Sequence, residues 1–473
     1  MAPGANRGSL LQELTRINHW WTDSDWARTD PQLLAARRAP YDYRPTVLAD
    51  IAPPNLYSLR GPRRVGKSTV LKQTIARLHR DGVDARRICY FAADSIESQR
   101  DIINVFQTAR SLFPDLGDAP RYFLIDEVTS VKDWQRGVKW LRDNTLVAGD
   151  CLVVTGSSAS DVAEGTVHLA GRRGEAVGLD RLLLPMSFPE FTKCAGYPLS
   201  DSARVPFAAF YTDEGRRVCQ DALVYLATLN DALDAYFLVG GFPQAVASFR
   251  QTAEVSAGFA RDLWDVVRSD LYRQGVSRPE HCLRLLEGVS SRITSTTSLP
   301  NLGTELDIDR RTVGTWLDAL ASSYLLLMLF KESAGAPEVG KLRKVYPVDP
   351  IIARLASLYS SGIPEPNPSQ LAEAVLAMAI FRSVEGGSID RFGRPERLFY
   401  YRSASNTEVD FLVLPERRAA ESKYIDTPDR RELRAMQDNF GEGLLLTHSA
   451  VDLQVKGTIL PTSVFAWLLD QGG

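Results

Sequence analysis

The chain has 473 residues, which is enough for about three domains of ordinary size. Hydrophobic residues make up 44% of it and charged residues 24%, which excludes disordered, collagen-like and disulfide-scaffold proteins. Lys and Arg number 55 against 58 Asp and Glu, giving a net charge of -3. This balance excludes a polybasic binder and restricts any nucleic-acid site to a local basic surface.

The cysteines and histidines give no sign of a disulfide framework or a zinc site. The five cysteines lie far apart without a C-x-x-C pair, and the five histidines add no zinc spacing. Residues 1–21 contain no apolar signal core, and the apolar runs are shorter than the ~20 residues that span a bilayer. We therefore expect a cytoplasmic protein with reduced thiols, neither secreted nor embedded in a membrane.

The first half of the chain predicts an α/β fold. Residues 1–50 are expected to form a helical lead-in that packs on the next domain. Short apolar strands then alternate with helix-length segments, and we expect the strands at residues 55–59, 88–93, 122–125 and 152–154. Strands separated by helices indicate βαβ units and a parallel sheet, covered by helices on both faces.

The second half begins with helices and ends with a mixed pattern. Long helices are expected at residues 221–236 and 257–271, and two shorter ones flank Asp307-Ile308-Asp309 in a helix-turn-helix rhythm. Glycine and prolines near residues 361–369 mark a boundary. Beyond it we expect a helix at 370–384 and strands at 398–401, 409–414 and 419–424.

Residues Gly61–Thr69 match the pattern G-x-x-x-x-G-K-[ST] between a strand and a helix. Gly61 and Gly66 let backbone N–H groups surround a phosphate, and the helix N-terminus adds partial positive charge. Lys67 would reach the β- and γ-phosphates, and the Ser68 hydroxyl would bind Mg²⁺. The alternative, a glycine-rich turn with a helix cap, is disfavoured by the flanking elements. The sequence predicts an ATP site at Gly61, Gly66, Lys67, Ser68 and Thr69.

A second motif, Tyr122–Glu127, is an apolar strand that ends in two carboxylates. Asp126 would lie at the carboxyl end of a strand, where α/β proteins gather their sites, and would help to hold Mg²⁺. Glu127 would then activate the attacking water. An acidic strand end can also serve as a helix cap, but the phosphate loop upstream favours the catalytic interpretation.

Two polar segments follow the next expected strand. In Thr155-Gly156-Ser157-Ser158 the hydroxyls would either sense a γ-phosphate or cap a helix. Arg172 and Arg173 are either solvated surface charges, or one of them is an arginine finger that supplies positive charge to the γ-phosphate in the transition state. A planar, always ionised side chain is suited to that role. A finger at Arg172 would act on a neighbouring subunit, so we expect a homo-oligomer.

Together these motifs resemble the AAA-type ATPases of bacteria and archaea that carry a C-terminal domain of unknown function. The resemblance covers roughly residues 50 to 450 and rests on the segments above together with three more: Leu169-Ala170-Gly171-Arg172, Leu184–Phe191 and Gly240-Gly241-Phe242-Pro243. It implies a P-loop core of the ASCE type, a helical lid, a winged helix and a tail resembling the PD-(D/E)xK nuclease fold. The expected domains are 1–50, 51–185, 186–278, 279–360 and 361–473.

The helix-turn-helix segment suggests a contact with nucleic acid. Arg310 and Arg311 would stand at the start of its second helix, where recognition helices present donors to phosphates. Winged helices also act as protein-binding or internal structural elements, so the two roles stay open.

The tail carries a candidate nuclease site at Glu373, Asp410, Glu421 and Lys423. Glu421 and Lys423 share one face of a strand because strand side chains alternate with a period of two, and Asp410 on a neighbouring strand could join them. Two carboxylates that bind Mg²⁺ beside a lysine are the layout of PD-(D/E)xK nucleases. The alternative is a polar strand face with salt bridges, and in the resembling family this domain is often suspected of being inactive.

The sequence thus predicts an ATPase that uses ATP and Mg²⁺ to drive motion between its core and its C-terminal modules. One hypothesis is an enzyme that acts on or binds DNA through the winged helix. The other is a nucleotide-dependent signalling or defence switch whose C-terminal modules bind proteins and whose nuclease-like domain is inactive.

Overall fold

The structure is a computed structural model that describes most of the chain. The described residues are 3–144, 146–156, 165–200, 203–273, 276, 280–338, 342–360, 362–386, 395–403, 407–454 and 456–471. The chain forms two compact units, Met1–Leu183 and Leu184–Gly473.

The first unit is built on a parallel sheet with the strand order β2-β3-β4-β1-β5. Its strands are β1 (Leu56–Arg60), β2 (Ile88–Ala92), β3 (Tyr122–Asp126), β4 (Cys151–Thr155) and β5 (Asp180–Leu182). The expectation of an α/β fold with a parallel sheet is confirmed. The sequence did not reveal β5, because Asp-Arg-Leu is too short and too polar to give a strand pattern.

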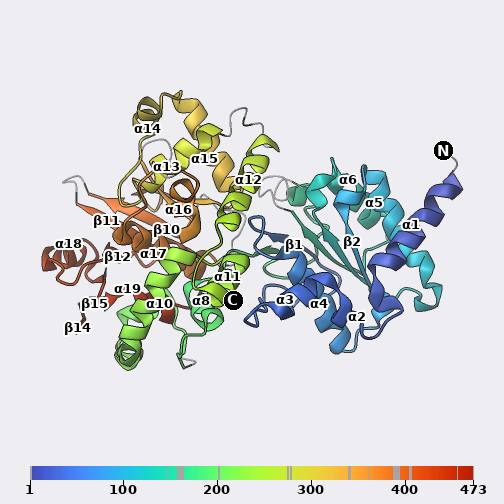
Figure 1. Cartoon of the computed structure of the whole chain (residues 1–473), viewed down its shortest axis with the longest axis horizontal. Helices are drawn as coiled ribbons and strands as arrows, with labels where there is room; N and C mark the ends of the chain where they lie inside the picture. Colours follow the sequence, from blue (N-terminus) through green and yellow to red (C-terminus); the bar gives the residue numbers. More distant parts are fainter. Residues whose placement is uncertain are drawn as a thin grey trace. The chain divides into compact units, whose positions relative to one another are not determined.

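Helices cover both faces of this sheet, as nearly continuous apolar strands require (Figure 1). One face packs against α1 (Pro3–Ile17), α5 (Gln99–Leu112) and α6 (Trp134–Asp143). The other packs against α2 (Trp26–Thr29), α3 (Pro31–Arg38) and α4 (Lys67–Arg80). Each face therefore has its own apolar core.

Side chains from the first helices cover the open edge of β2. Asn18 exchanges two hydrogen bonds with the Tyr90 backbone, donating from Nδ2 to the carbonyl oxygen (2.9 Å) and accepting from the amide at Oδ1 (2.7 Å). The indole Nε1 atoms of Trp20 and Trp21 both donate to the Ile88 carbonyl. The edge strand thus has side-chain partners where a further strand would otherwise pair.

The second unit opens with helices and a short hairpin. The helices are α8 (Phe188–Ala195), α9 (Asp213–Ala222), α10 (Leu226–Val239), α11 (Pro243–Thr252), α12 (Ala257–Arg273), α13 (Glu280–Ser290), α14 (Leu299–Leu306) and α15 (Arg310–Ser322). The expected helix at 221–236 is divided, because a short 3₁₀ turn at Leu223–Tyr225 separates α9 from α10.

An antiparallel hairpin follows α15. It pairs β6 (Leu326–Phe330) with β9 (Arg343–Pro347), and two short strands, β7 (Glu332–Ser333) and β8 (Ala336–Pro337), lie between them. Thr297, before α14, forms an isolated bridge with Arg343. The helices α13, α14 and α15 and the hairpin together form one substructure. It is followed by α16 (Pro350–Tyr359).

The C-terminal part is a six-stranded mixed sheet with the order β10-β11-β12-β13-β15-β14. Its strands are β10 (Leu398–Arg402), β11 (Glu408–Val413), β12 (Arg418–Lys423), β13 (Gly443–Thr447), β14 (Asp452–Gln454) and β15 (Gly457–Pro461). Its helices are α17 (Pro368–Glu385), α18 (Arg430–Phe440) and α19 (Thr462–Leu468). The first three strands are antiparallel, and α18 connects β12 to the parallel β13.

Within the part of the chain that the structure describes, one helical stretch is long and apolar enough to cross a bilayer. It is Asp213–Val239, whose most apolar window has a mean hydropathy of 1.3. It includes the 3₁₀ turn between α9 and α10, and α10 buries Leu229, Leu233 and Phe237 inside the second unit. An apolar core helix passes the same test, so the stretch is weak evidence for a membrane span.

Candidate functional site

The loop between β1 and α4 has the backbone that the phosphate-loop pattern requires. Gly61 and Gly66 have φ values of 148° and 101°, in the region that favours glycine. A Cβ on Gly61 would lie 1.9 Å from the Leu183 carbonyl oxygen, whereas a Cβ on Gly66 would meet open space. The first position needs glycine for close packing, and the second needs it for backbone conformation.

Lys67 lies at the start of α4 with its ammonium turned back onto the loop. Its Nζ donates to the carbonyls of Gly61 (2.8 Å) and Pro62 (2.9 Å), and the residue is 6% exposed. No side chain caps α4 at Gly66, whereas Ser68 and Thr69 in its first turn are half-buried. Backbone N–H groups at a helix N-terminus beside a buried lysine are suited to bind a polyphosphate.

Asp126 lies at the carboxyl end of β3 and is held by two hydroxyl groups. Thr155 Oγ1 donates to its Oδ1 (2.5 Å), and the Tyr90 hydroxyl donates to its Oδ2 (3.2 Å). Glu127, the next residue, donates its backbone N–H to the same Thr155 Oγ1 (2.9 Å). Thr155 on β4 therefore orients both acidic residues.

The strand order brings this acidic end close to the phosphate loop. β4 lies between β1 and β3, and its Thr155 is in register with Leu59, two residues before Gly61. Parallel strands end at one edge of a sheet, so the loop, Thr155 and Asp126 share that edge. A carboxylate and a serine hydroxyl there are oxygen ligands of the kind that Mg²⁺ prefers.

Asp180 joins β5 to β1 just before the phosphate loop. It accepts hydrogen bonds from Ser58 Oγ (2.5 Å), Arg60 Nη2 (2.5 Å) and Arg173 Nη1 (2.7 Å). Burial by itself would raise the pKa of Asp180, but these partners outweigh it and hold the pKa at about 2.

The Asp180 cluster gives a prediction about acid stability. Because the pKa of the folded state is about 2, below the ordinary 3.8, the ionised carboxylate stabilises the fold above pH 3.8. This contribution of about 2 kcal/mol is lost as the pH falls towards 2. Asp180→Asn should lower the free energy of unfolding at neutral pH by about that amount, and the deficit should shrink in acid. Urea melts at several pH values measure it, and an equal deficit at every pH would contradict it.

The candidate finger Arg172 lies on the surface of the first unit. Its Nε and Nη2 contact the two carboxylate oxygens of Asp143 at 2.5 and 3.2 Å, and the side chain is 34% exposed. Its neighbour Arg173 belongs to the Asp180 cluster. Ser157 and Ser158, the proposed phosphate sensors, lie outside the described residues.

In the second unit, Arg310 and Arg311 are both exposed in the first turn of α15. Asp309 caps this helix by accepting the Arg311 backbone N–H at Oδ1 (2.8 Å). Three residues, Asp307–Asp309, separate α15 from α14. The helix start thus presents two arginine side chains to solvent.

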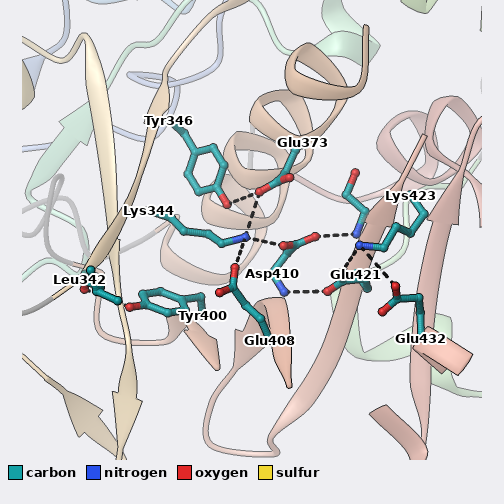
Figure 2. A network of polar contacts seen from close by, with 11 residues as sticks. Leu342, Lys344, Tyr346, Glu373, Tyr400, Glu408, Asp410, Glu421, Lys423 and Glu432 are labelled. Atoms are coloured by element: carbon teal, nitrogen blue, oxygen red, sulfur yellow. Dashed lines mark hydrogen bonds and ion pairs between the residues drawn. The ribbon is translucent and has the colours of Figure 1, made fainter. Parts of the chain in front are cut away.

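The four residues singled out in the tail come together, as Figure 2 shows. Asp410 on β11 accepts the Ser422 N–H at Oδ2 (2.9 Å), and its own N–H donates to Glu421 Oε2 (2.9 Å). Lys423 Nζ donates to Glu421 Oε1 (2.6 Å). Glu373, from α17, lies in the same network and is 3% exposed.

The sequence did not reveal the central member of this network, Lys344 on β9. Its fully buried ammonium contacts Glu373 Oε1 (3.2 Å), Glu408 Oε1 (3.1 Å) and Asp410 Oδ1. No motif marks this lysine. The strand β9 was not expected from the sequence, and the signal that could have found the lysine is that Lys344 and Tyr346 stand two residues apart and so share one face of a strand.

The protonation of the cluster is shifted by burial and by the close charges. Burial and the neighbouring Asp410 raise the pKa of Glu373 to about 7 and that of Glu421 to about 8. Burial would lower the pKa of Lys344, but Asp410, Glu373 and Glu408 raise it well above its ordinary value. Lys344 therefore stays charged, whereas Glu373 and Glu421 hold a proton more readily than ordinary carboxyl groups.

Comparison with protein families identifies two regions. Residues 53–192 match the family model of the AAA domain, and residues 230–361 match a domain of unknown function (DUF8612). An uncharacterized protein of Haemophilus influenzae is 24% identical over 432 residues, which are 87% of this chain and 93% of that protein. Residues 53–192 thus match an AAA domain, and the sheet order and the phosphate loop in this region are those of a P-loop core.

Three solved structures are similar at low identity. The Walker-type ATPase PABY2304 of Pyrococcus abyssi is 14% identical with a TM-score of 0.37, covering 64% of this chain and 90% of that one. Orc1 of Aeropyrum pernix, solved in complex with DNA, is 12% identical with a TM-score of 0.26 (70% and 92%). Cdc6p of Pyrobaculum aerophilum is 12% identical with a TM-score of 0.24 (72% and 94%).

Proposed function

We propose that the chain is a cytoplasmic, Mg²⁺-dependent ATPase. The observation that carries the proposal is the phosphate loop of an AAA-type domain, whose Lys67 ammonium is held by the Gly61 and Pro62 carbonyls. Next to it, Asp126 and Glu127 share the Thr155 hydroxyl at the same edge of the sheet. This edge of the sheet therefore has groups suited to bind a polyphosphate and groups suited to activate a water molecule.

In this proposal each residue has one task. Lys67 and the N–H groups of the first turn of α4 bind the β- and γ-phosphates, and Glu127 accepts the proton of the attacking water. Ser68 and Asp126 would hold Mg²⁺, which when bound neutralises charge on the phosphate oxygens. Thr155 and Tyr90 keep the Asp126 carboxylate in one orientation.

The direct test is phosphate release by the purified chain. We expect hydrolysis of ATP that depends on Mg²⁺ and stops when the metal is chelated. A chain that binds ATP with Mg²⁺ but releases no phosphate, alone or with nucleic acid added, would contradict the proposed ATPase.

We further propose that the segment α13 to β9 is a winged helix that binds nucleic acid through the start of α15. Two exposed arginines at a helix start after a three-residue turn support this, and so does the hairpin that follows. Such arginines contact phosphates, so binding should be insensitive to sequence and sensitive to salt.

A matched pair of double variants tests this contact. Replacing Arg310 and Arg311 by Ala should weaken DNA binding and shallow its log-log salt dependence by roughly one to two units. The chain offers a control in Arg430 and Arg431, which are also exposed at the start of a helix capped by an aspartate. Anisotropy titrations at several salt concentrations compare the two. Unchanged affinity after the Arg310 and Arg311 replacement would assign α15 to protein contact, and an equal loss in both variants would contradict a specific role of α15.

For the tail we propose the PD-(D/E)xK architecture. Its order of α17, β10, β11, β12, α18 and β13 supports it, with Asp410 on the second strand and Glu421 and Lys423 on the third. Cleavage of nucleic acid is not part of this proposal, because the buried Lys344 ammonium already contacts carboxylates that a catalytic metal would need.

A further inference from the structure

The acidic cluster of the tail receives a buried cation from outside the tail. Lys344 and Tyr346 project from the same face of β9, a strand of the hairpin that follows α15. The Lys344 ammonium and the Tyr346 hydroxyl both reach Glu373 Oε1, at 3.2 and 2.7 Å (Figure 2). One strand thus supplies two donors to a single carboxylate.

The same ammonium also contacts the two acidic residues of β11. It lies 3.1 Å from Glu408 Oε1 and contacts Asp410 Oδ1, and Lys344 has no exposed surface. A buried ammonium is stable only when nearby charges and hydrogen bonds compensate its loss of hydration. Three carboxylates provide that compensation, so they and the lysine depend on one another.

The remaining carboxylate oxygens of the candidate nuclease site also have partners within the protein. Asp410 Oδ2 accepts the Ser422 N–H, and Glu421 is bound by Lys423 and by the Asp410 N–H. Among the residues that the structure describes, no three His, Cys, Asp or Glu side chains are arranged to hold a metal ion. The residues of the cluster, as folded, do not fit a catalytic Mg²⁺.

Burial of the side chains alone would not keep a metal ion out of this cluster. A cleft of about 480 Å³ is lined by Glu373, Glu408, Asp410, Glu421 and Lys423, so small ions can reach these side chains from solvent. What differs from a metal site is the charge already present between Glu373 and Asp410. An ammonium and a divalent cation would compete for the same carboxylate oxygens. Two cations bound to the same oxygens lie so close together that they repel each other strongly.

We propose that Lys344 is the built-in cation of the tail, and that it excludes divalent metal from the Glu373, Glu408 and Asp410 cluster. The nuclease-like domain is then a metal-free variant of its architecture. The ammonium fixes α17 and β11 to the hairpin β6–β9, and the acidic residues serve this attachment rather than phosphodiester hydrolysis.

The test is a titration of the full chain with Mn²⁺, without nucleotide and at mildly alkaline pH, in which electron paramagnetic resonance measures the bound metal. Asp410→Asn alone should leave the Mn²⁺ binding of the chain as it is in the wild type. Lys344→Met should gain one Mn²⁺ site, at least about tenfold tighter than any binding to the wild type. Adding Asp410→Asn to Lys344→Met should abolish that site. Lys331→Met, a half-buried lysine on the same hairpin, is the matched control and should gain none.

Two results would overturn the proposal. One is Mn²⁺ binding by the wild type that Asp410→Asn removes, and the other is a folded Lys344→Met chain that binds no Mn²⁺. If Lys344→Met does not fold, Lys344→Gln keeps a polar group at the site, and its melting temperature should rise with Mn²⁺ while that of the wild type does not. The wild-type measurement tests the proposal even if neither variant folds. None of these results depends on ATP hydrolysis.

Discussion

Replacing Lys67 by Ala is expected to weaken ATP binding roughly 10- to 100-fold, the usual effect of removing a hydrogen-bonded charge from a phosphate site. Replacing Glu127 by Gln should instead leave binding intact and slow hydrolysis by roughly 10²- to 10⁴-fold, because only proton acceptance is lost. The two substitutions act on different groups, since Lys67 contacts the loop carbonyls and Glu127 bonds to Thr155 through its backbone. Fluorescent-nucleotide binding and single-turnover phosphate release measure them separately.

The exposed Lys139 on α6 provides a control for the loss of a positive charge in the same unit. Lys139→Ala should bind and hydrolyse ATP like the wild type. Undiminished turnover in Glu127→Gln would move the catalytic base to another residue. Full ATP affinity in Lys67→Ala would remove the phosphate loop from the site.

Arg172→Ala is expected to lower kcat by about 10³-fold or more while ATP affinity is kept, if Arg172 acts as a finger on a neighbouring subunit. The guanidinium is now bound to Asp143 in its own chain, so the finger requires that this pair opens. Asp143→Ala removes only the partner. It should leave kcat unchanged or raise it, whereas a purely structural ion pair would make both variants slightly less stable without changing kcat.

Mixing experiments test whether the finger works between subunits. At an ATP concentration too low to occupy Lys67→Ala chains, mixing these chains with Arg172→Ala chains should restore part of the hydrolysis, because an intact Lys67 can then meet an intact Arg172. ATP should also promote assembly in sedimentation experiments. A fully active monomer, or mixtures that stay inactive, would leave Arg172 as a surface charge.

The first unit could be predicted from the sequence because its signals are local. Apolar runs mark β1 to β4, and the phosphate loop follows from the spacing of Gly61, Gly66 and Lys67. Gly61 and Gly66 have positive φ, as the phosphate-loop pattern requires, whereas Arg64, Glu127 and Asp133 also have positive φ without any glycine to signal it. The Asp180 cluster could not be predicted from the sequence, because its partners Arg60 and Arg173 belong to different segments of the chain.

The second unit was harder to predict because its decisive contacts join distant segments. Glu373, Asp410, Glu421 and Lys423 were found from strand alternation and a family resemblance, but Lys344 is 66 residues from Asp410 and belongs to no motif. Its charge even argues against a buried position, which lysines rarely occupy without partners. Only the fold brings the three compensating carboxylates to it.

The cover over β2 bears on how the first fifty residues should be regarded. Asn18, Trp20 and Trp21 occupy backbone groups of an edge strand whose apolar faces are already buried. Uncovered, such an edge is a template on which another polypeptide can add a strand, the first step towards aggregation. The N-terminal segment therefore occupies the backbone groups on which such a strand would pair, and we expect that replacing Asn18, Trp20 and Trp21 by Ala makes the protein more prone to aggregate, as light scattering would measure.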